Sequence, residues 1–595
     1  MSVTGGNSRM AARSIWRSEP REEETGAKNP HAAGAGGTPF MPYLTKHRDE
    51  TGLSQAEVIH PRKAAAQPLY DIEMSAKRIG VFGWGLVAPK SPNIEAFRKN
   101  LATATSWLTP FNGYGPDNFL VGNPDFDFED YRPWVDARFA PRHFRTLQEK
   151  MDFPVQYALA AFIQALGQNP GLEQELQSLG KFAHVYAGTG LGSLGAIHDA
   201  SIKHYKRQRA WNRFWSAPLR NKALREHKCG SEADAGVPPC PDTITDPTAR
   251  EEAEDAWFAY WTDRSDQLRV YLAELAEIEG ATIQEGEIEA AKLGAIRDRE
   301  KRRARLKDKW GVPEVPWHVS ANVIWNIPNV PASQISILGK ITGFAFAPVA
   351  ACSTFGVALK LGMDAIRSGE AKAVVVGATD SPPNPLTVGA FHSARVLSAG
   401  SDPSVPLTRM KGTHVAGGSV VWIIGDMDYM KSKGFKPLGM EPVAAGVSSD
   451  ADHIITPSTD GPRSAMQQAL DAAGAGPSDI GTWDMHATAT PGDFMEVSNL
   501  RSVVGEQVLV SARKGTFGHG MSAGGGWELT AQYLGYQEGR IFPTPLKKEE
   551  LNATIAAVHQ RMVFDQPCEL PPGLAGKISM GIGGINACVI SRPLA

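Results

Sequence analysis

The sequence predicts an α/β protein, because short apolar runs that end in glycine alternate with segments of helical spacing. Residues 77–85 form such a run and lead into a helical stretch over 93–101. A predicted helix over 148–166 leads to a second run at 181–190. The run at 373–376 is apolar throughout, as is typical of a strand buried on both faces of a sheet.

Length and composition indicate a large soluble protein. A chain of 595 residues exceeds one compact core, so we expect two fused units or one large duplicated fold with additions. The formal net charge of -3 provides no general attraction to nucleic acid or anionic membranes. No apolar run reaches the roughly 18 residues of a spanning helix, and the N-terminus lacks the apolar core of a secretory signal. With only five cysteines, these features predict a cytoplasmic protein with no membrane span and no nucleic-acid partner.

Two segments depart from the α/β alternation. Residues 1–75 are rich in Gly, Ala, Pro, Ser and charge, so we expect a mostly disordered leader. Residues from about 203 to 312 begin with a Pro-rich loop and continue as long charged helices, which indicates a helical insertion. The basic run at 297–309 is most simply a solvated helix face, with docking of an acidic partner as the alternative. We expect the main body to bury an aromatic face of the insertion, which comprises Trp257, Phe258, Tyr260 and Trp261.

Cys352 is the candidate nucleophile. An apolar approach over residues 344–351 ends at this cysteine, and apolar residues follow it with helical spacing. Cys352 is therefore expected at a helix N-terminus, where unpaired amides and the helix dipole favour the thiolate. Taken alone, a buried cysteine is more often a small hydrophobic residue than a nucleophile. The assignment therefore depends on partner residues.

Two histidines are candidate partners. His486 follows a short predicted strand and opens a polar loop. His519 precedes a Gly-rich turn and a helix that begins near Trp527. Either histidine alone is most simply a structural or surface residue. Their significance lies in their combination with Cys352.

Four motifs then occur in a distinctive order. They are Ala-Cys-Ser-Thr at 351–354, His-Ala-Thr-Ala-Thr at 486–490, Lys-Gly-Thr-Phe-Gly-His at 514–519 and Gly-Ile-Gly-Gly-Ile-Asn at 581–586. In this order they resemble the ketoacyl-acyl carrier protein synthases. The resemblance extends over residues 77–101, 151–192 and 317–595.

The resemblance implies a thiolase-like fold, a duplicated five-layered α-β-α-β-α arrangement to which the helical insertion is added. The first half, residues 76–400, would carry the nucleophile, and the second half, residues 401–595, would carry both histidines. The family also implies a homodimer that acts on acyl and malonyl thioesters in fatty acid or polyketide biosynthesis. No bound cofactor or metal is expected, because the phosphopantetheine arrives on an acyl carrier protein partner.

A decarboxylating Claisen condensation is the implied reaction. By resemblance, Cys352 would take an acyl group from a pantetheine thioester. His486 and His519 would hold the thioester oxygen of the malonyl substrate while carbon dioxide leaves. The backbone amides of Cys352 and Ile582 would form the oxyanion hole for the condensation step.

Further residues take supporting roles by the same resemblance. Lys514 would set the electrostatics beside His519. Thr488 and Thr490 would contact pantetheine, and Glu496 would join a carboxylate network near Lys514.

The chain also departs from the family pattern. Ala487 stands where the family usually has Gly, which affects the transfer of the pantetheine contacts. Ile582 replaces the common gatekeeper Phe, so the acyl pocket and its gate are expected to differ.

Three alternative functions stay open. A thiolase-type acyltransferase uses a second cysteine as base, and Cys588 lies near the C-terminus, although its surroundings resemble a strand interior. A non-catalytic partner subunit of another ketosynthase would commonly lack the cysteine that this chain retains at position 352. A cysteine hydrolase needs fewer groups than Cys352, two histidines and Lys514 provide.

A zinc site is a weaker hypothesis. His227, Cys229 and Cys240 lie close together in the sequence. They lack the paired C-x-x-C spacing and offer only three ligands, so an irregular loop is the simpler interpretation.

Overall fold

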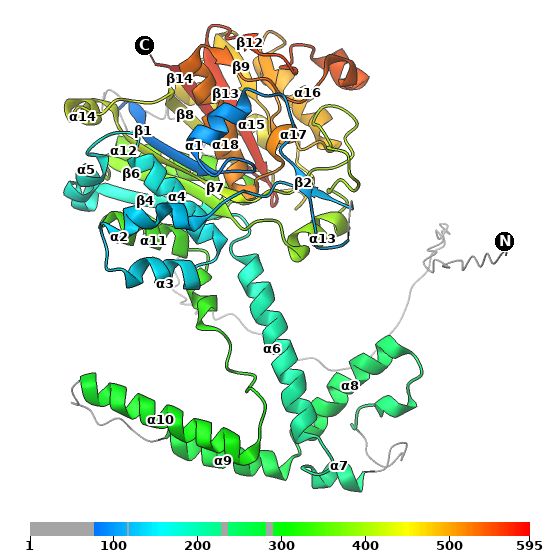
Figure 1. Cartoon of the computed structure of the whole chain (residues 1–595). Coiled ribbons are helices and arrows are strands. Elements are labelled where there is room, and N and C mark those ends of the chain that lie inside the picture. The colour runs from blue at the N-terminus through cyan, green and yellow to red at the C-terminus, as the bar shows by residue number, and fades with distance from the viewer. Residues whose placement is uncertain (1–76, 116–117, 228–235, 281–288, 595) are drawn as a thin grey trace, which may run out of the picture. The chain divides into compact units, whose positions relative to one another are not determined.

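The computed structural model describes residues 77–115, 118–227, 236–280 and 289–594 (Figure 1). The predicted leader at 1–75 therefore lies outside the described residues. Two five-stranded sheets form the framework. The first contains β1 (Ile79–Val87), β4 (Ala183–Thr189), β5 (Ala345–Phe346), β6 (Ala373–Asp380) and β7 (Gly418–Asp426). The second contains β8 (Met440–Ser449), β9 (Ile480–Asp484), β10 (Leu509–Ser511), β13 (Leu574–Gly581) and β14 (Ile585–Pro593).

The two sheets have the same topology. The first has the order β1-β7-β6-β4-β5, and the second, read from its β8 edge, has the order β8-β14-β13-β9-β10. In each sheet three neighbouring strands run parallel, and the strand that joins them to the other edge runs antiparallel to both of its neighbours. Matching order and direction show an internal duplication. The predicted α/β class is confirmed, and the thiolase-like arrangement implied by the motifs is present.

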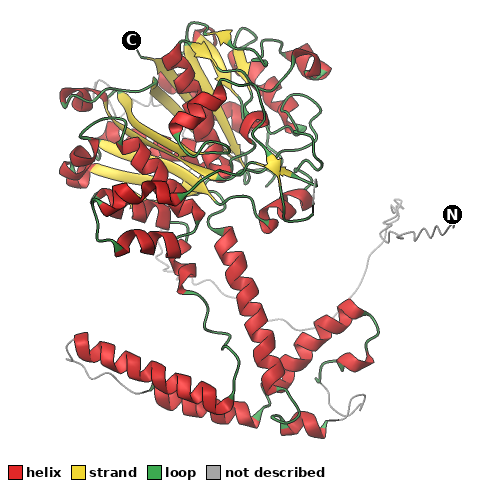
Figure 2. Ribbon diagram, in the orientation of Figure 1, coloured by secondary structure: helices red, strands yellow, loops and turns green. Residues whose placement is uncertain are grey.

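Helices cover both faces of the sheets (Figure 2). Between the sheets lie α12 (Thr354–Ser368), which packs on β6 and β8, and α18 (Met521–Glu538), which packs on β6 and β13. The outer face of the first sheet is covered by α4 (Phe153–Leu166) and α11 (Val330–Gly339). The outer face of the second is covered by α15 (Asp460–Ala473) and α16 (Gly492–Val504). The five layers therefore alternate α-β-α-β-α.

The central helix α18 is buried on all sides, which explains its composition. Every residue from 521 to 535 is buried, so the helix has no polar stripe. A Cβ on Gly526 would lie 2.4 Å from Val420 Cγ1, and a Cβ on Gly525 would lie 2.5 Å from Ser579 Oγ. Because Val420 is in the first sheet and Ser579 in the second, glycine at these positions allows α18 to approach both sheets closely.

The insertion is helical as predicted, but its aromatic face packs differently. It contains α6 (Leu194–Trp215), α7 (Lys222–Glu226), α8 (Pro247–Thr262), α9 (Asp266–Glu279) and α10 (Glu289–Trp310). One buried cluster is built from residues 211–312 alone and includes Trp211, Trp215, Leu268 and Tyr271. A second cluster contains Cys240, Trp257 and Trp261. The expectation that this aromatic face packs on the main body is therefore wrong, because the rings bury one another.

Part of the basic run of α10 is paired with acidic residues of α9. Arg303 bonds Glu279 of α9, and Lys309 lies 2.8 Å from Glu274 of the same helix. These ion pairs join two helices that pack side by side (Figure 1). Arg303 and Lys309 therefore help to join the two helices, and docking of an acidic partner on this run stays an open alternative.

Short elements complete the described chain. The helices are α1 (Ile94–Leu101), α2 (Arg132–Asp136), α3 (Arg142–Lys150), α5 (Leu172–Ser178), α13 (Pro385–Ser393), α14 (Met427–Ser432), α17 (Lys514–Phe517) and α19 (Ala553–Val558). The strands are β2 (Thr109–Pro110), β3 (Leu120–Val121), β11 (Arg540–Ile541) and β12 (Cys568–Glu569). Within the described ranges no helix combines the length and apolarity that crossing a bilayer requires.

Candidate active site

Cys352 lies in a short 3-10 turn, Ala351–Ser353, that leads directly into α12. The preceding Ala351 has φ of +47°, a left-handed conformation that strains a residue with a side chain. The following Ser353 donates hydrogen bonds to the carbonyls of Ser579 (3.0 Å) and Ile585 (2.7 Å) in the second half of the chain. The turn that carries the thiol is thus held at the boundary between the two halves.

Both candidate histidines lie close to the thiol. His519 Nε2 is 3.0 Å from Cys352 Sγ. The rings of His486 and His519 are 5.2 Å apart between centroids and nearly perpendicular. His486 follows β9, and His519 lies between α17 and α18, where its amide donates to the carbonyl of His414. The fold therefore brings together three residues that are 134 and 33 positions apart along the chain (352 to 486 and 486 to 519).

Burial controls the protonation of these groups. It raises the pKa of Cys352 to about 11, and hydrogen bonds from the amides of Ile582 and Cys352 together with the nearby Lys514 cation offset only part of this effect. The helix start by itself therefore does not ionise the resting thiol, because desolvation has the larger effect on its pKa. Burial and the charge of Lys514 also lower the pKa of His486 and His519 well below the ordinary value, so both imidazoles are neutral.

The two amides predicted to form the oxyanion hole influence the nucleophile. The amides of Ile582 and Cys352 both lower the pKa of the Cys352 thiol, which indicates that they lie near its sulfur. Ile582 follows β13 in a glycine-rich loop, and 42% of its surface is exposed. The loop thus presents an amide to the site while its side chain faces outward.

The loop after His486 is held by two buried carboxylates. Glu496 accepts hydrogen bonds from the amides of His486 (2.6 Å) and Ala487 (2.8 Å). Asp493, which sequence reasoning missed, accepts from the amides of Thr488 (2.9 Å) and of Ala489. These bonds fix the backbone that carries His486.

The predicted pantetheine residues lie on the same loop. Thr488 and Thr490 are half-buried, and their hydroxyl oxygens are 3.0 Å apart. The structure therefore places both hydroxyls together within four residues of His486.

Lys514 is held by a buried carboxylate beside the histidines. Its ammonium group donates to the carbonyl of His486 and to Glu528 (2.6 Å), whereas Glu496 binds backbone amides. Glu528 also lies 2.8 Å from Lys577 of β13, and beside them Arg513 donates to Asp484 at 2.7 Å. Sequence reasoning missed these four residues. The available signal was a charged residue inside an otherwise apolar helix or strand, which indicates a buried, paired group.

Asp380, which sequence reasoning also missed, connects the two halves of the chain near the nucleophile. This buried carboxylate at the end of β6 accepts hydrogen bonds from the amides of Gly190, Leu191 and Gly192 and from that of Ser522. Ser522 lies in the first turn of α18. Asp380 therefore connects the loop after β4 to the helix that follows His519.

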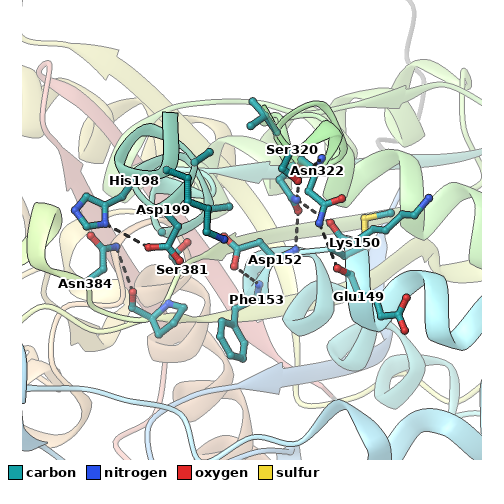
Figure 3. Close-up of a pocket in the computed structure, with 18 of the residues that line it drawn as sticks. Glu149, Lys150, Asp152, Phe153, His198, Asp199, Ser320, Asn322, Ser381 and Asn384 are labelled. Carbon is teal, nitrogen blue, oxygen red and sulfur yellow. Dashed lines mark hydrogen bonds and ion pairs between the residues drawn. The ribbon is translucent and has the colours of Figure 1, made fainter. Parts of the chain in front are cut away.

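A cavity of about 430 Å³ lies beside the junction of the insertion with the main body (Figure 3). It is lined by the end of α3, the first turns of α6, residues 320–326 and the turn after β6. Asn326 accepts from the amide of Asp152 (2.6 Å) and donates to the carbonyl of Lys150 (2.9 Å). None of the predicted site residues lines this cavity, so it is separate from the Cys352 centre.

The weaker hypothesis of a zinc site at His227, Cys229 and Cys240 has no support in the described residues. Cys240 is disulfide-bonded, and Cys229 lies outside the described residues. In the described ranges no group of three or more His, Cys, Asp or Glu residues is arranged to hold a metal ion.

Comparison with known families identifies both halves of the chain. Residues 281–424 match the model of the beta-ketoacyl synthase N-terminal domain, and residues 441–546 match that of the C-terminal domain. The first match contains Cys352, and the second contains His486 and His519.

Relatives of known name match the same region. A 3-oxoacyl-[acyl-carrier-protein] synthase 2 of Staphylococcus aureus is 29% identical over 281 residues, which cover 45% of this chain and 67% of the relative. The enzyme of the same name from Rhizobium meliloti is 29% identical over 306 residues, which cover 48% of this chain and 69% of the relative. The matched part thus spans about two thirds of the relatives' length.

Solved structures show the same fold. The ishigamide ketosynthase/chain length factor covers 87% of this chain and all of its own, with a TM-score of 0.60 and 17% identity. A beta-ketoacyl synthase from Burkholderia phymatum has the same coverage, with a TM-score of 0.58 and 16% identity. The fold and the site define a thiolase-like protein. Within that class, residues 281–424 and 441–546 match the two domain models of the beta-ketoacyl synthases, and the named relatives are enzymes of the same kind.

We predict that Cys352 is the cysteine that becomes acylated, because among the free cysteines that the structure describes it alone lies within hydrogen-bond distance of a histidine ring, 3.0 Å from His519 Nε2. Intact-protein mass spectrometry after incubation with acyl thioesters should show one acyl group, and Cys352→Ala should show none. The buried Cys588 provides the matched control, since Cys588→Ala should retain acylation. Persistent acylation of Cys352→Ala would contradict the assignment.

The buried carboxylates predict an unusual pH dependence of stability. Burial raises the pKa of Glu496 to about 7 and that of Asp493 to about 6. The folded state therefore holds protons that the unfolded state releases, so the contribution of these groups to the free energy of unfolding falls as pH rises from about 4 to about 7. Urea unfolding across this range should show a steeper loss with rising pH for the wild type than for Glu496→Gln. Equal slopes would contradict the raised pKa.

Proposed function

We propose that this chain catalyses a decarboxylating Claisen condensation between an acyl group on Cys352 and a malonyl thioester delivered by an acyl carrier protein. The observation that carries the proposal is the 3.0 Å contact between Cys352 Sγ and His519 Nε2, with the ring of His486 beside it. A nucleophile with two neutral imidazoles suits acyl transfer followed by stabilisation of an enolate.

In the first half-reaction, Cys352 attacks the carbonyl of the acyl thioester. His519 Nε2 accepts the thiol proton as the new carbon–sulfur bond forms, and the proton passes to the departing pantetheine thiolate. The developing oxyanion lies against the amides of Cys352 and Ile582. The products are the acyl-enzyme and the free thiol of the first carrier.

In the second half-reaction, the malonyl thioester loses carbon dioxide and becomes an enolate. The neutral imidazoles of His486 and His519 each donate one N–H to the thioester oxygen, where negative charge develops. The enolate carbon attacks the acyl carbon, the bond to Cys352 Sγ breaks, and the thiolate takes up a proton. The overall reaction consumes one proton and yields a 3-oxoacyl thioester and carbon dioxide.

The named relatives support a carrier-bound substrate. Both matched relatives are 3-oxoacyl-[acyl-carrier-protein] synthases. The phosphopantetheine would then come from the carrier, with Thr488 and Thr490 as its contacts on the loop after His486. The site itself requires no bound cofactor for this chemistry.

The alternative functions fit the site less well. Cys588 is completely buried in β14, and burial raises its pKa far above the ordinary value, so it is poorly suited to be a thiolase base. A non-catalytic subunit would not need the contact between Cys352 and His519. The condensing enzyme is therefore the function that we propose.

Single substitutions should affect condensation and malonyl decarboxylation differently. Cys352→Gln should abolish condensation but retain malonyl decarboxylation, because decarboxylation uses the imidazoles and not the thiol. His519→Ala should reduce decarboxylation about 100-fold or more, as expected when one oxyanion donor is removed. Release of carbon dioxide from labelled malonyl-carrier measures both effects. Loss of decarboxylation in a folded Cys352→Gln variant would refute the separation of roles.

We further propose a homodimer, which the edge of the first sheet supports. β5 is an edge strand, and the side chains around it are apolar and exposed: Phe344 is 59% exposed and Phe346 is 43% exposed. An exposed apolar edge strand favours pairing with another strand. A second copy of the same strand would cover it.

Phe346→Asp should therefore weaken the dimer, because it places a charge in the proposed interface. Light scattering should show a dimer for the wild type and a monomer for the variant at micromolar concentration. Leu219→Asp is the matched control, since Leu219 is 89% exposed but lies in the insertion. A wild-type monomer would refute the proposal.

A further inference from the structure

The feature that the proposed mechanism leaves unexplained is a second buried lysine behind the two histidines. Lys577 is 1% exposed and lies within β13, a strand that is otherwise apolar or small. Its ammonium group lies 2.8 Å from Glu528 Oε2, while Lys514 bonds the other oxygen of the same carboxylate at 2.6 Å. One buried carboxylate therefore holds two buried cations.

The neighbouring ion pair of Arg513 and Asp484 does not neutralise the excess positive charge of the two lysines. In the parallel register between β13 and β9, Lys577 stands beside Asp484. Asp484, however, already bonds Arg513 at 2.7 Å. Three cations, Arg513, Lys514 and Lys577, thus face two carboxylates, Asp484 and Glu528. The cluster carries one net positive charge if each group is ionised.

The net positive charge of this cluster lies close to the imidazoles of His486 and His519. Lys514 donates to the carbonyl of His486, and Lys514 and Lys577 are both cations whose charge lowers the pKa of His486 and of His519. Other ionisable groups near the imidazoles are the thiol of Cys352, the ring of His414, and three carboxylates that bind backbone amides, Asp380, Glu496 and Asp493.

We propose that Lys577 is a positioning residue for decarboxylation: by sharing Glu528 with Lys514, it keeps a net positive charge behind His486 and His519. The inference rests on the proposed function and deepens it. A positive potential at this place favours the enolate, which carries negative charge only in the transition state and the intermediate. It also disfavours protonation of the imidazoles, so both remain hydrogen-bond donors without becoming cations.

Removal of the Lys577 charge should act on the rate and not on binding. In Lys577→Met, Glu528 and Lys514 neutralise each other, and the cluster loses its net charge. We expect kcat for malonyl decarboxylation to fall about 10-fold, since electrostatic stabilisation of an oxyanion is realised mainly in the transition state, while KM changes less than twofold. Lys577→Gln, which keeps an amide donor but removes the charge, should behave in the same way and guards against a folding defect of the methionine variant.

A second substitution should restore the rate if net charge is the cause. In the double variant Lys577→Met/Glu528→Gln, Lys514 faces a neutral amide and the cluster regains one positive charge. Its kcat should exceed that of Lys577→Met at least threefold. A purely structural ion pair predicts the opposite order, because the double variant removes more contacts. Glu441→Gln is the matched control: Glu441 is also buried and paired, with Arg78 at 2.6 Å, but belongs to β8, and its kcat should stay at the wild-type value.

A measurement without substrate separates this inference from the proposed function. NMR titration of 13C-histidine-labelled protein should give a higher imidazole pKa for His519 in Lys577→Met than in the wild type, because a nearby cation has been removed. If the wild type does not decarboxylate malonyl thioesters, the proposed function is wrong. The NMR titration then remains as the test of the electrostatic role of Lys577. An unchanged histidine pKa together with an unchanged kcat, or a double variant no faster than Lys577→Met, would overturn the inference.

Discussion

The packing of α12 and α18 between the two sheets is the constraint on which the rest of the structure depends. Cys352 lies at the start of α12, and His519 lies just before α18, so the distance between sulfur and imidazole follows from how closely these helices approach. Gly525 and Gly526 make that approach possible, because a Cβ at either position would collide with one of the two sheets. The chemistry is therefore located where the duplicated halves meet.

Burial gives the site its chemical character. The same desolvation that keeps both imidazoles neutral also keeps the Cys352 thiol protonated, so the nucleophile needs a base beside it and not merely a helix start. Buried charges are tolerated only when they are paired, because an unpaired one is strongly destabilising. Pairing through Glu528 and Asp484 is how this chain keeps three cations behind the site. Exclusion of water from the interior therefore both shifts the pKa of the reactive groups and requires the buried charges to be paired.

The insertion shows how a large segment can be added without disturbing this interior. Its aromatic residues form their own cluster around Trp211 and Trp215, and its charged helices are joined by ion pairs such as Arg303 with Glu279. A segment that buries its own apolar surface needs only anchored ends. Asn326 provides one such anchor through its hydrogen bonds with Asp152 and Lys150.

The sequence by itself determined the α/β class, the helical nature of the insertion and the identity of Cys352, His486 and His519 as the residues to examine, because these depend on local periodicity and on short motifs. Only the tertiary structure decided which groups surround those residues and which of them are protonated. That Lys514 pairs with Glu528, that Lys577 joins them and that the Cys352 thiol is protonated all depend on contacts between residues far apart in the chain and on the extent of their burial. No local pattern records these contacts, since the low dielectric that shifts a pKa exists only after the two sheets have closed on the helices between them.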